Sequence, residues 1–399
     1  MKRFTLMLVL CLAAVAIFAG PARINVIKQA EENPKIAFKG LADDPALSRE
    51  VENFLKVCGW FDLARSGRAD YTLELQREGG AVRADLAIGG APVESWRFRN
   101  LRDPRAAAKL IVDTLIERSF KELKVRSFCT SRIAFCAETS PGVRNIFLCD
   151  IDGRSVEQLT RFRSLCVEPC WNPSGASVFY SKYSRSGIDV IETTVGPRQM
   201  SRIVSSFRGI NAGAAVSPDG RRMAVILSFD HMVDLYIMDI RTRKLVRLTK
   251  GMPVEASPCW SPDGRQIAYV SDESGVPRIQ VVGVDGRGRK RLPTIGSDAV
   301  TPDWSGDGQI VFASRVNGSY TLGVYDPQSG KCRRVTNEPG SWESPAWAAD
   351  NRQVVCKRTL GGKSGLFVVD TRTGRIRELL STGYPLSMPA WSPCAPARK

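Results

Sequence analysis

One five-residue phrase recurs six times from residue 171 onward, and its spacing is nearly constant. The fullest copies read Trp-Ser-Pro-Asp-Gly, and the six copies begin at Trp171, Val216, Trp260, Trp304, Trp347 and Trp391. Successive copies are 45, 44, 44, 43 and 44 residues apart. Self-similarity at a fixed period of this length is typical of repeat architectures, in which each copy is one supersecondary unit.

Each copy predicts the same local structure. Ser-Pro-Asp-Gly favours a tight turn, because proline presets φ, aspartate bonds its own backbone and glycine accepts a left-handed conformation. A β-rich run follows each turn, at residues 177–181, 223–227, 266–271, 309–314 and 353–357. A second run follows a polar hairpin, at residues 188–192, 234–239, 278–284, 321–326 and 365–370. With a weaker strand after it, each repeat supplies the four short strands of a β-propeller blade.

The two ends of the repeat region complete one another. Residues 132–137, 145–150 and 156–160 resemble the second, third and fourth strands of a blade, and residues 388–393 resemble a first strand without followers. Pairing them predicts an all-β six-bladed propeller over 126–399, closed by its C-terminal strand so that no sheet edge stays open. The repeated tryptophans are expected to fill the wedges between blades.

Residues 34–125 predict a separate small α/β domain. A strand over 35–39 precedes a helix over 45–59 capped by Asp44, and a second helix over 104–120 is capped by Asp103. Between them lie strands expected at 70–76, 82–88 and 94–99. The residues expected to face inward are Leu47, Val51, Phe54, Leu55, Ala107, Leu110, Ile111 and Leu115. The fold class is therefore an α+β N-terminal domain followed by an all-β propeller.

Residues 1–22 resemble a secretory signal peptide, with Lys2 and Arg3 before an uncharged apolar run and then small residues. Cleavage is expected after Ala22, with Ala19 as the competing site, which leaves 23–33 as an extended N-terminal segment. The run ending at Cys11 loosely resembles a lipoprotein box, but it would leave too short an apolar region, so we do not expect lipidation. The mature chain is expected in the periplasm as a monomer.

The formal net charge is +16, which favours anionic surfaces or acidic partners. No basic run is interleaved with aromatic residues, so nucleic-acid binding is not expected. Ten of the 11 cysteines would remain after processing; we expect buried small hydrophobic residues, with room for one or two disulfides. Cys136 and Cys149 fall on neighbouring expected strands, and Cys166 and Cys170 are four apart, but the connectivity stays open.

The sequence lacks the residue patterns that a serine peptidase, a phosphate-binding loop or a metal site would need. No Gly-x-Ser-x-Gly elbow occurs, and the single histidine, His231, falls in an expected hairpin. Residues 361–364 read Gly-Gly-Lys-Ser, but the first glycine of a phosphate-binding loop is missing, so we expect a hairpin turn there. With one histidine and no Cys-x-x-Cys pair, a metal site is not expected, and no cofactor is predicted. The repeated aspartates are expected to form turns.

Several segments resemble the TolB family of the Tol–Pal system. Residues 130–135 (Thr-Ser-Arg-Ile-Ala-Phe) are similar to the family's entry into its first blade, residues 234–239 (Asp-Leu-Tyr-Ile-Met-Asp) to a family strand, and residues 389–393 (Pro-Ala-Trp-Ser-Pro) to its closing segment. Arg23-Ile24 and residues 34–38 resemble the mature N-terminus. The chain departs from the family between 28 and 33, around 60–100, and in its number of cysteines.

The resemblance implies a binding role in the cell envelope. TolB-like proteins bind the peptidoglycan-associated lipoprotein at one propeller face, and their N-terminal segment docks onto the propeller or binds the inner-membrane protein TolA. The system couples outer-membrane invagination to cell division and maintains outer-membrane integrity. Here the N-terminal segment alternates apolar and polar residues, which suits strand addition to a partner; its candidate residues are Arg23, Ile24, Asn25, Val26 and Ile27.

The loops before each innermost strand are expected to converge at one mouth of the propeller, and loops on a rigid scaffold are where recognition concentrates. They span 161–168, 205–212, 250–256, 295–301, 337–343 and 381–387. The candidate partner-binding residues on them are Arg161, Arg163, Glu168, Arg208, Asn211, Glu255, Asp298, Trp342, Glu343 and Tyr384. Trp342 is expected to be an exposed anchor, and Asn211 alone matches a family binding position by type.

Two other functions stay open. The first is a generic envelope propeller that scaffolds other partners, as in outer-membrane assembly. The second is an isolated propeller of the peptidase type, which the missing hydrolase domain disfavours. No partner can be assigned from the residues alone.

Overall fold

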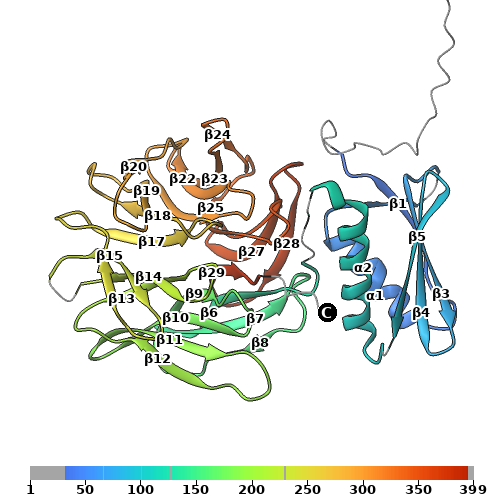
Figure 1. Ribbon diagram of the computed structural model, residues 1–399, viewed down its shortest axis with the longest axis horizontal. Helices are drawn as coiled ribbons and strands as arrows, with labels where there is room; N and C mark the ends of the chain where they lie inside the picture. The colour runs from blue at the N-terminus through green and yellow to red at the C-terminus, as the bar shows by residue number, and fades with distance from the viewer. Residues whose placement is uncertain are drawn as a thin grey trace, which may run out of the picture.

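The computed structural model describes residues 32–393, except 66, 100, 124, 126–127 and 229–230. It shows a small α/β layer beside a ring of six four-stranded sheets (Figure 1). The predicted signal peptide and most of the predicted N-terminal segment lie outside the described residues.

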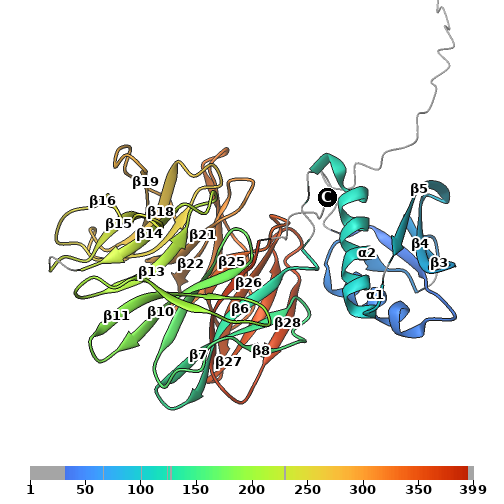
Figure 2. The same ribbon diagram turned by 60° about the horizontal axis from the view of Figure 1, so that its bottom comes forward.

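The N-terminal layer is a five-stranded sheet with two helices on one face. Its order is β2-β1-β3-β4-β5, and the helices lie between this sheet and the propeller in both views (Figures 1 and 2). The Asp44 side chain accepts a hydrogen bond from Leu47 N at 3.0 Å, and Asp103 caps the second helix in the same way. The elements are β1 (Lys35–Lys39), α1 (Pro45–Val57), β2 (Asp62–Leu63), β3 (Tyr71–Glu78), β4 (Ala81–Ile88), β5 (Ala91–Arg99) and α2 (Pro104–Ser119).

The structure corrects two details of this layer. The two-residue strand β2, which pairs in parallel with β1, was not predicted, because two residues carry no periodic signal. Leu110 was expected to face inward, but 46% of it is exposed. Ala107, Ala108, Ile111 and Leu115 already occupy the buried face of α2, and Leu110 falls outside their arc.

The propeller comprises strands β6 to β29, which form six antiparallel four-stranded sheets. The strands are β6 (Arg132–Ser140), β7 (Val143–Asp150), β8 (Glu157–Gln158), β9 (Cys166–Trp171), β10 (Ser177–Ser184), β11 (Gly187–Thr194), β12 (Ser201–Ser205), β13 (Asn211–Val216), β14 (Arg222–Leu227), β15 (Asp234–Asp239), β16 (Leu245–Arg247), β17 (Glu255–Trp260), β18 (Gln266–Ser271), β19 (Arg278–Gly283), β20 (Lys290–Arg291), β21 (Ala299–Trp304), β22 (Ile310–Val316), β23 (Ser319–Asp326), β24 (Lys331–Arg334), β25 (Ser341–Trp347), β26 (Gln353–Leu360), β27 (Lys363–Asp370), β28 (Ile376–Ser381) and β29 (Leu386–Trp391). The predicted six-bladed architecture is confirmed. We number the blades 1 to 6 from β9 to β29.

Blade 6 is assembled from both ends of the propeller segment. Its order is β29-β6-β7-β8, with Trp391 opposite Ile133 and Leu386 opposite Ala137. Arg132 N donates to Ser392 Oγ at 2.9 Å, and Ser392 N donates to Arg132 O at 2.8 Å. The predicted closure of the ring by the C-terminal strand is therefore confirmed.

The repeated phrase builds the turn and the wedge as expected. Asp219 Oδ1 accepts from Arg221 N at 3.1 Å, and Gly220 has φ +71°. Three tryptophans donate an indole N–H to a carbonyl of the neighbouring blade: Trp171 to Ala390, Trp260 to Ala215 and Trp347 to Asp303. The tryptophan rings thus fix the spacing between adjacent blades.

Each innermost strand carries an irregularity that the repeat had not revealed. The ladder between the first and second strands shifts register once in every blade, three residues before the repeated tryptophan or valine. The residue at that point has positive φ in all six blades: Glu168, Gly213, Ser257, Thr301, Ser344 and Met388. Such bulges bend a strand, and they line the central channel here.

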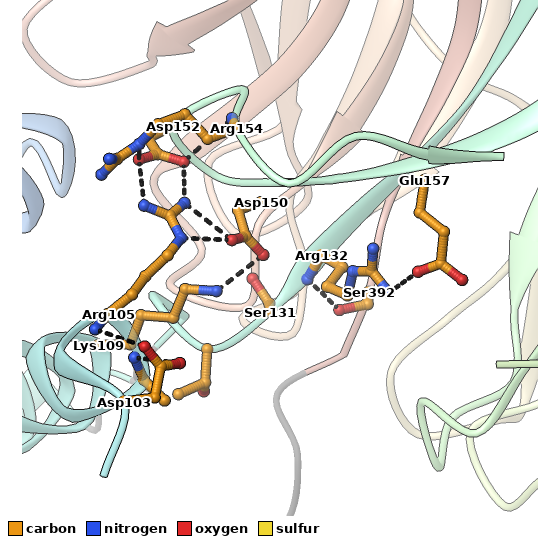
Figure 3. A network of polar contacts seen from close by, with 12 residues as sticks. Asp103, Arg105, Lys109, Ser131, Arg132, Asp150, Asp152, Arg154, Glu157 and Ser392 are labelled. Carbon is orange, nitrogen blue, oxygen red and sulfur yellow. Dashed lines mark hydrogen bonds and ion pairs between the residues drawn. The ribbon is translucent and has the colours of Figure 1, made fainter. Parts of the chain in front are cut away.

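Charged side chains join the α/β layer to the propeller (Figure 3). Arg105 of α2 contacts Asp150 at 2.8 Å and Asp152 at 2.5 Å, and Lys109 contacts Asp150 at 2.7 Å. Asp152 remains strongly ionised, because the hydrogen bonds from Arg105 and Arg154 outweigh burial and lower its pKa. Further along, Trp60 Nε1 donates to Asp350 at 3.0 Å. One hydrophobic cluster runs through both parts, so they share a core.

Candidate protein-binding face

The two ends of the propeller ring differ in what covers them. Antiparallel blades place the loops before each innermost strand, and the hairpins between second and third strands, at one end, which we call the loop face. The other end carries the turns between first and second strands and between third and fourth strands, and we call it the turn face. The α/β layer contacts turn-face residues such as Asp152, Arg352 and Arg375. The loop face is free of that contact.

Four of the ten candidate residues are exposed on the loop face. Arg161 and Arg163 lie between β8 and β9, Arg208 lies between β12 and β13, and Tyr384 lies between β28 and β29 with 61% of its surface exposed. Arginine and tyrosine are the side chains most often found at the energetic centre of protein interfaces. These four residues can reach a partner without rearrangement of the blades.

Two exposed apolar residues of the same face were not singled out from the sequence. Met252 and Val254 lie in the loop before β17 and are 84% and 48% exposed. Val254 N donates to Asp272 at 2.7 Å, which ties this loop to the hairpin of blade 3. The sequence did carry a signal for them, because Met252 and Val254 are apolar residues that fall outside the expected strands of the repeat. Exposed methionine adapts its shape readily to a partner.

Trp342 is not the exposed anchor that was predicted. Only 1% of its surface is exposed, its indole Nε1 donates to Glu338 O at 3.1 Å, and its ring packs edge-on against Phe367 at 5.8 Å. The Arg358 guanidinium lies 4.8 Å from the ring centre. The ring fills the wedge between blades 4 and 5 instead of meeting solvent, because it occupies a position of the innermost strand that is buried in every blade.

Asn211 is also buried, and it holds a loop together. Its side chain accepts from Ser205 Oγ at 2.7 Å and from Phe207 N at 2.8 Å, and it donates to Phe207 O at 2.6 Å. These bonds satisfy backbone groups that the turn leaves unpaired. The residue can shape the Arg208 loop, but its own atoms do not face solvent.

Three acidic candidates are engaged within the propeller. Glu168 accepts from Ser181 Oγ at 2.7 Å and from Gly213 N at 2.9 Å, and so links blades 1 and 2. Asp298 accepts from Arg315 at 3.0 Å, and Glu343 accepts from Lys357 at 3.1 Å. All three are half-buried. These three side chains hold the loops of the loop face in place more than they project from it toward solvent.

Glu255 is the most unusual of the candidates. It is 2% exposed, one carboxylate oxygen has no hydrogen-bond partner among the described residues, and the Arg289 guanidinium is 4.0 Å away. Burial raises the pKa of this carboxyl to about 7, and nearby Asp234 and Glu273 add to the shift. The side chain therefore changes charge close to neutral pH.

We expect Glu255→Gln to stabilise the protein at pH 8 by about 2–3 kcal/mol and to change it little at pH 5. The folded protein holds this proton up to about pH 7, whereas an unfolded glutamate loses it near pH 4.3. Between those values the folded state binds more protons, so its stability falls as pH rises. Denaturant unfolding at both pH values measures this, with Glu343→Gln as the control. An equal effect at both pH values would contradict the shift.

A channel of about 950 Å³ runs along the propeller axis. The innermost strands, the residues after them and Leu123 line it, and no lysine, arginine or histidine is among the described lining residues. Asp303 lies there, where burial raises its pKa to about 6. Among the residues that the structure describes, no group of three or more histidine, cysteine, aspartate or glutamate side chains is placed to hold a metal ion.

The nine described cysteines form no disulfide with one another, and seven of them are buried, as expected for small hydrophobic residues. Cys136 and Cys149 do lie on neighbouring strands, β6 and β7, but they do not face one another in the ladder. Burial raises the pKa of Cys166 to about 11, so this thiol is held in its unreactive form.

The remaining sequence candidates have simple places in the fold. His231 is exposed in the connection between β14 and β15, and Gly361 and Gly362 form the hairpin turn between β26 and β27, as predicted. Residues 23–27, the candidate N-terminal segment, lie outside the described residues. In the described part of the chain, no helix has the length and apolarity needed to cross a bilayer.

Fold and face together define a β-propeller scaffold with an N-terminal α/β layer and a free loop face. The model of the TolB beta propeller domain family matches residues 121–395, and the chain belongs to this family. Curated relatives include Tol-Pal system protein TolB from two subspecies of Francisella tularensis, tularensis and mediasiatica, each 27% identical over 132 residues. That match spans 31% of this chain and 30% of each relative.

Solved structures agree on the architecture. TolB from Acinetobacter baumannii superposes with a TM-score of 0.79 at 21% identity, covering 90% of this chain and 97% of that one. A structure described as putative TolB from Agrobacterium tumefaciens gives 0.53 at 18% identity, covering 64% and 91%. At these identities the likeness establishes the fold, which includes the N-terminal layer in the first case.

Proposed function

We propose that this protein is a non-enzymatic, periplasmic component of the Tol–Pal system. In this role its loop face binds the peptidoglycan-associated lipoprotein, and its N-terminal segment, residues 23–27, binds a TolA-like inner-membrane protein. The chain would reach the periplasm through cleavage of the signal peptide at residues 1–22. By joining these partners it would couple outer-membrane invagination to cell division and help to maintain the outer membrane.

The observation that carries the proposal is family membership over residues 121–395, combined with a loop face left uncovered by the α/β layer. The exposed residues of that face combine arginine, tyrosine and methionine around a rigid ring, the composition of a recognition surface. The sequence holds no Gly-x-Ser-x-Gly elbow, and its single histidine lies exposed between β14 and β15, which favours binding over hydrolysis as the activity. The engaged acids Glu168 and Glu343 keep the loops in place beneath the contact residues.

A binding assay with the purified soluble domain of the same organism's peptidoglycan-associated lipoprotein tests the face. We expect the mature chain to bind, and we expect a variant with Arg161, Arg208 and Tyr384 changed to alanine to bind at least tenfold more weakly. The control changes Arg49, Arg68 and Val93 to alanine, which are exposed residues of the α/β layer. Equal loss in both variants would contradict the assignment of the face.

The N-terminal segment needs a separate experiment. A chain that begins at Pro34 is expected to keep lipoprotein binding and to lose binding to the periplasmic domain of the TolA-like protein. Loss of both activities would contradict the division of labour between segment and face. Failure of the full mature chain to bind the lipoprotein at all would favour the alternative, a general envelope scaffold with other partners.

A further inference from the structure

The turn face of blades 1 to 3 carries a dense set of exposed cations. Seven of them lie in or beside the turns between first and second strands and between third and fourth strands, and the other two form the outer strand β20 of blade 3. We call this set the basic rim, and its members are Arg198, Arg221, Arg241, Arg243, Lys244, Arg265, Arg287, Lys290 and Arg291. All nine are exposed.

Hydrogen bonds show that the rim is one continuous surface. Within a blade, Ile240 N donates to Arg221 O and Val284 N donates to Arg265 O, each at 3.0 Å, which joins the two kinds of turn. Between blades, Arg222 donates to Gly264 O at 3.2 Å. Arg243 donates to Ile203 O of blade 1 at 3.0 Å. The cations of the turns therefore lie on one face of three neighbouring blades, and Lys290 and Arg291 lie along the outer edge of blade 3.

The acidic residues of these turns offset only part of the positive charge of the rim. Asp219 and Asp263 each accept from a serine hydroxyl and a backbone N–H of their own turn, and Asp239 accepts from both groups of Thr242. These bonds lower the pKa of all three carboxyls, so they stay ionised. Together with the exposed Asp285, they set four acidic residues against the nine rim cations. Within the described part of the chain, no ion pair joins a rim cation to a carboxylate.

Blades 5 and 6 provide an internal comparison on the same face. There Arg154 pairs with Glu50 and Asp152, Arg352 pairs with Asp370, and Arg375 pairs with Asp62. Two of these acids belong to the α/β layer, which covers that sector. Where the turn face meets another surface, its cations form ion pairs with acids, whereas the nine rim cations of the uncovered sector have no ion-pair partner among the described residues.

We propose that the basic rim docks onto the surface of an anionic lipid bilayer. Its charges are dispersed over convex turns, and laterally mobile lipid headgroups can adapt to such a pattern, whereas a protein partner would need a matching set of fixed acids. A protein interface also needs an apolar centre. Beside the rim, the exposed large hydrophobic residues that the structure describes are Met200, Ile203 and Val246, at 70%, 49% and 51%, and all three lie in or next to the outer strands β12 and β16. The turn face would then lie on the membrane and leave the loop face open.

The test uses the mature chain and vesicles without protein, so it is independent of the proposed lipoprotein binding. We expect co-sedimentation with phosphatidylcholine vesicles that contain phosphatidylglycerol, weak binding to pure phosphatidylcholine, and release at high salt. Each basic residue near an anionic surface strengthens adsorption roughly fivefold. Changing Arg241, Lys244, Arg287 and Arg291 to glutamine is therefore expected to weaken binding at least thirtyfold.

The matched control changes Arg49, Arg65, Arg68 and Arg99 to glutamine, which removes the same charge from the α/β layer. It is expected to keep binding within about fivefold, and thermal unfolding checks that both variants fold. Equal loss in the two variants would overturn the proposal, because net charge rather than the rim would then act. Equal binding to both kinds of vesicle would also overturn it. Rim-dependent binding of polyglutamate with no vesicle binding would assign the rim to an acidic polypeptide instead.

Discussion

A chain truncated after Pro385 is expected to lose the cooperative unfolding transition of the propeller. The truncation removes β29, and with it the buried side chains of Leu386 and Trp391 and the ladder to β6. Losing two such side chains costs about 5–10 kcal/mol, which approaches the whole stability of a typical protein, about 5–15 kcal/mol. The open edge of β6 would also favour aggregation. Circular dichroism during thermal or denaturant unfolding measures the transition.

The control is a chain truncated after Pro393, which keeps every strand of blade 6. It is expected to unfold as the full chain does, because the bonds between Arg132 and Ser392 are retained. If the shorter chain ending at Pro385 unfolded with an unchanged midpoint, blade 6 would not depend on closure. The stability of the ring would then reside within single blades.

The architecture could be predicted from sequence because the repeat encodes it locally six times. Each blade needs a large ring, a turn and a hairpin at fixed intervals; the phrase beginning at Trp260 supplies the ring and the turn, and the polar residues after 271 supply the hairpin. Closure followed from the two incomplete ends. The short strand β2 escaped detection, since two residues paired to β1 depend on tertiary position and not on a pattern.

The binding face was harder to predict, because the type of a residue does not show whether its side chain is buried between two blades or exposed on the loop face. Three of the ten candidates, Asn211, Glu255 and Trp342, occupy one repeat position, five residues before the repeated tryptophan or valine. That position is buried in all six blades: Cys166, Asn211, Glu255, Ala299, Trp342 and Leu386. Aligning the repeats would have disclosed an apolar majority at this position and marked it as interior.

The bulges of the innermost strands were also not predicted from the sequence. Five of the six residues with positive φ on the innermost strands precede a proline, as in Ser257-Pro258 and Thr301-Pro302. Proline disfavours the helical conformation of the residue before it, but it does not select a left-handed one. The conformation accompanies the register shift of the innermost strand where these residues line the central channel, a position that a single repeat does not reveal.

Trp342→Ala is expected to lower the free energy of unfolding by about 3–5 kcal/mol. The change empties the wedge between blades 4 and 5, ends the edge-on contact with Phe367, and leaves Arg358 without the ring beneath it. Trp342→Phe should cost less, because it keeps an aromatic ring and loses mainly the bond to Glu338 O, worth about 1 kcal/mol. Denaturant unfolding of both variants gives these differences directly.

Tyr384→Ala is the matched control, because it removes an aromatic ring from the same face where 61% of the residue is exposed. Its unfolding free energy should stay within about 0.5 kcal/mol of the parent, while its affinity for the lipoprotein should fall. Trp342→Ala and Tyr384→Ala together therefore distinguish a residue that stabilises the propeller from a residue that contacts the partner. If Trp342→Ala kept full stability and lost lipoprotein binding, the ring would have to leave the wedge on binding, and Trp342 would be a contact residue after all.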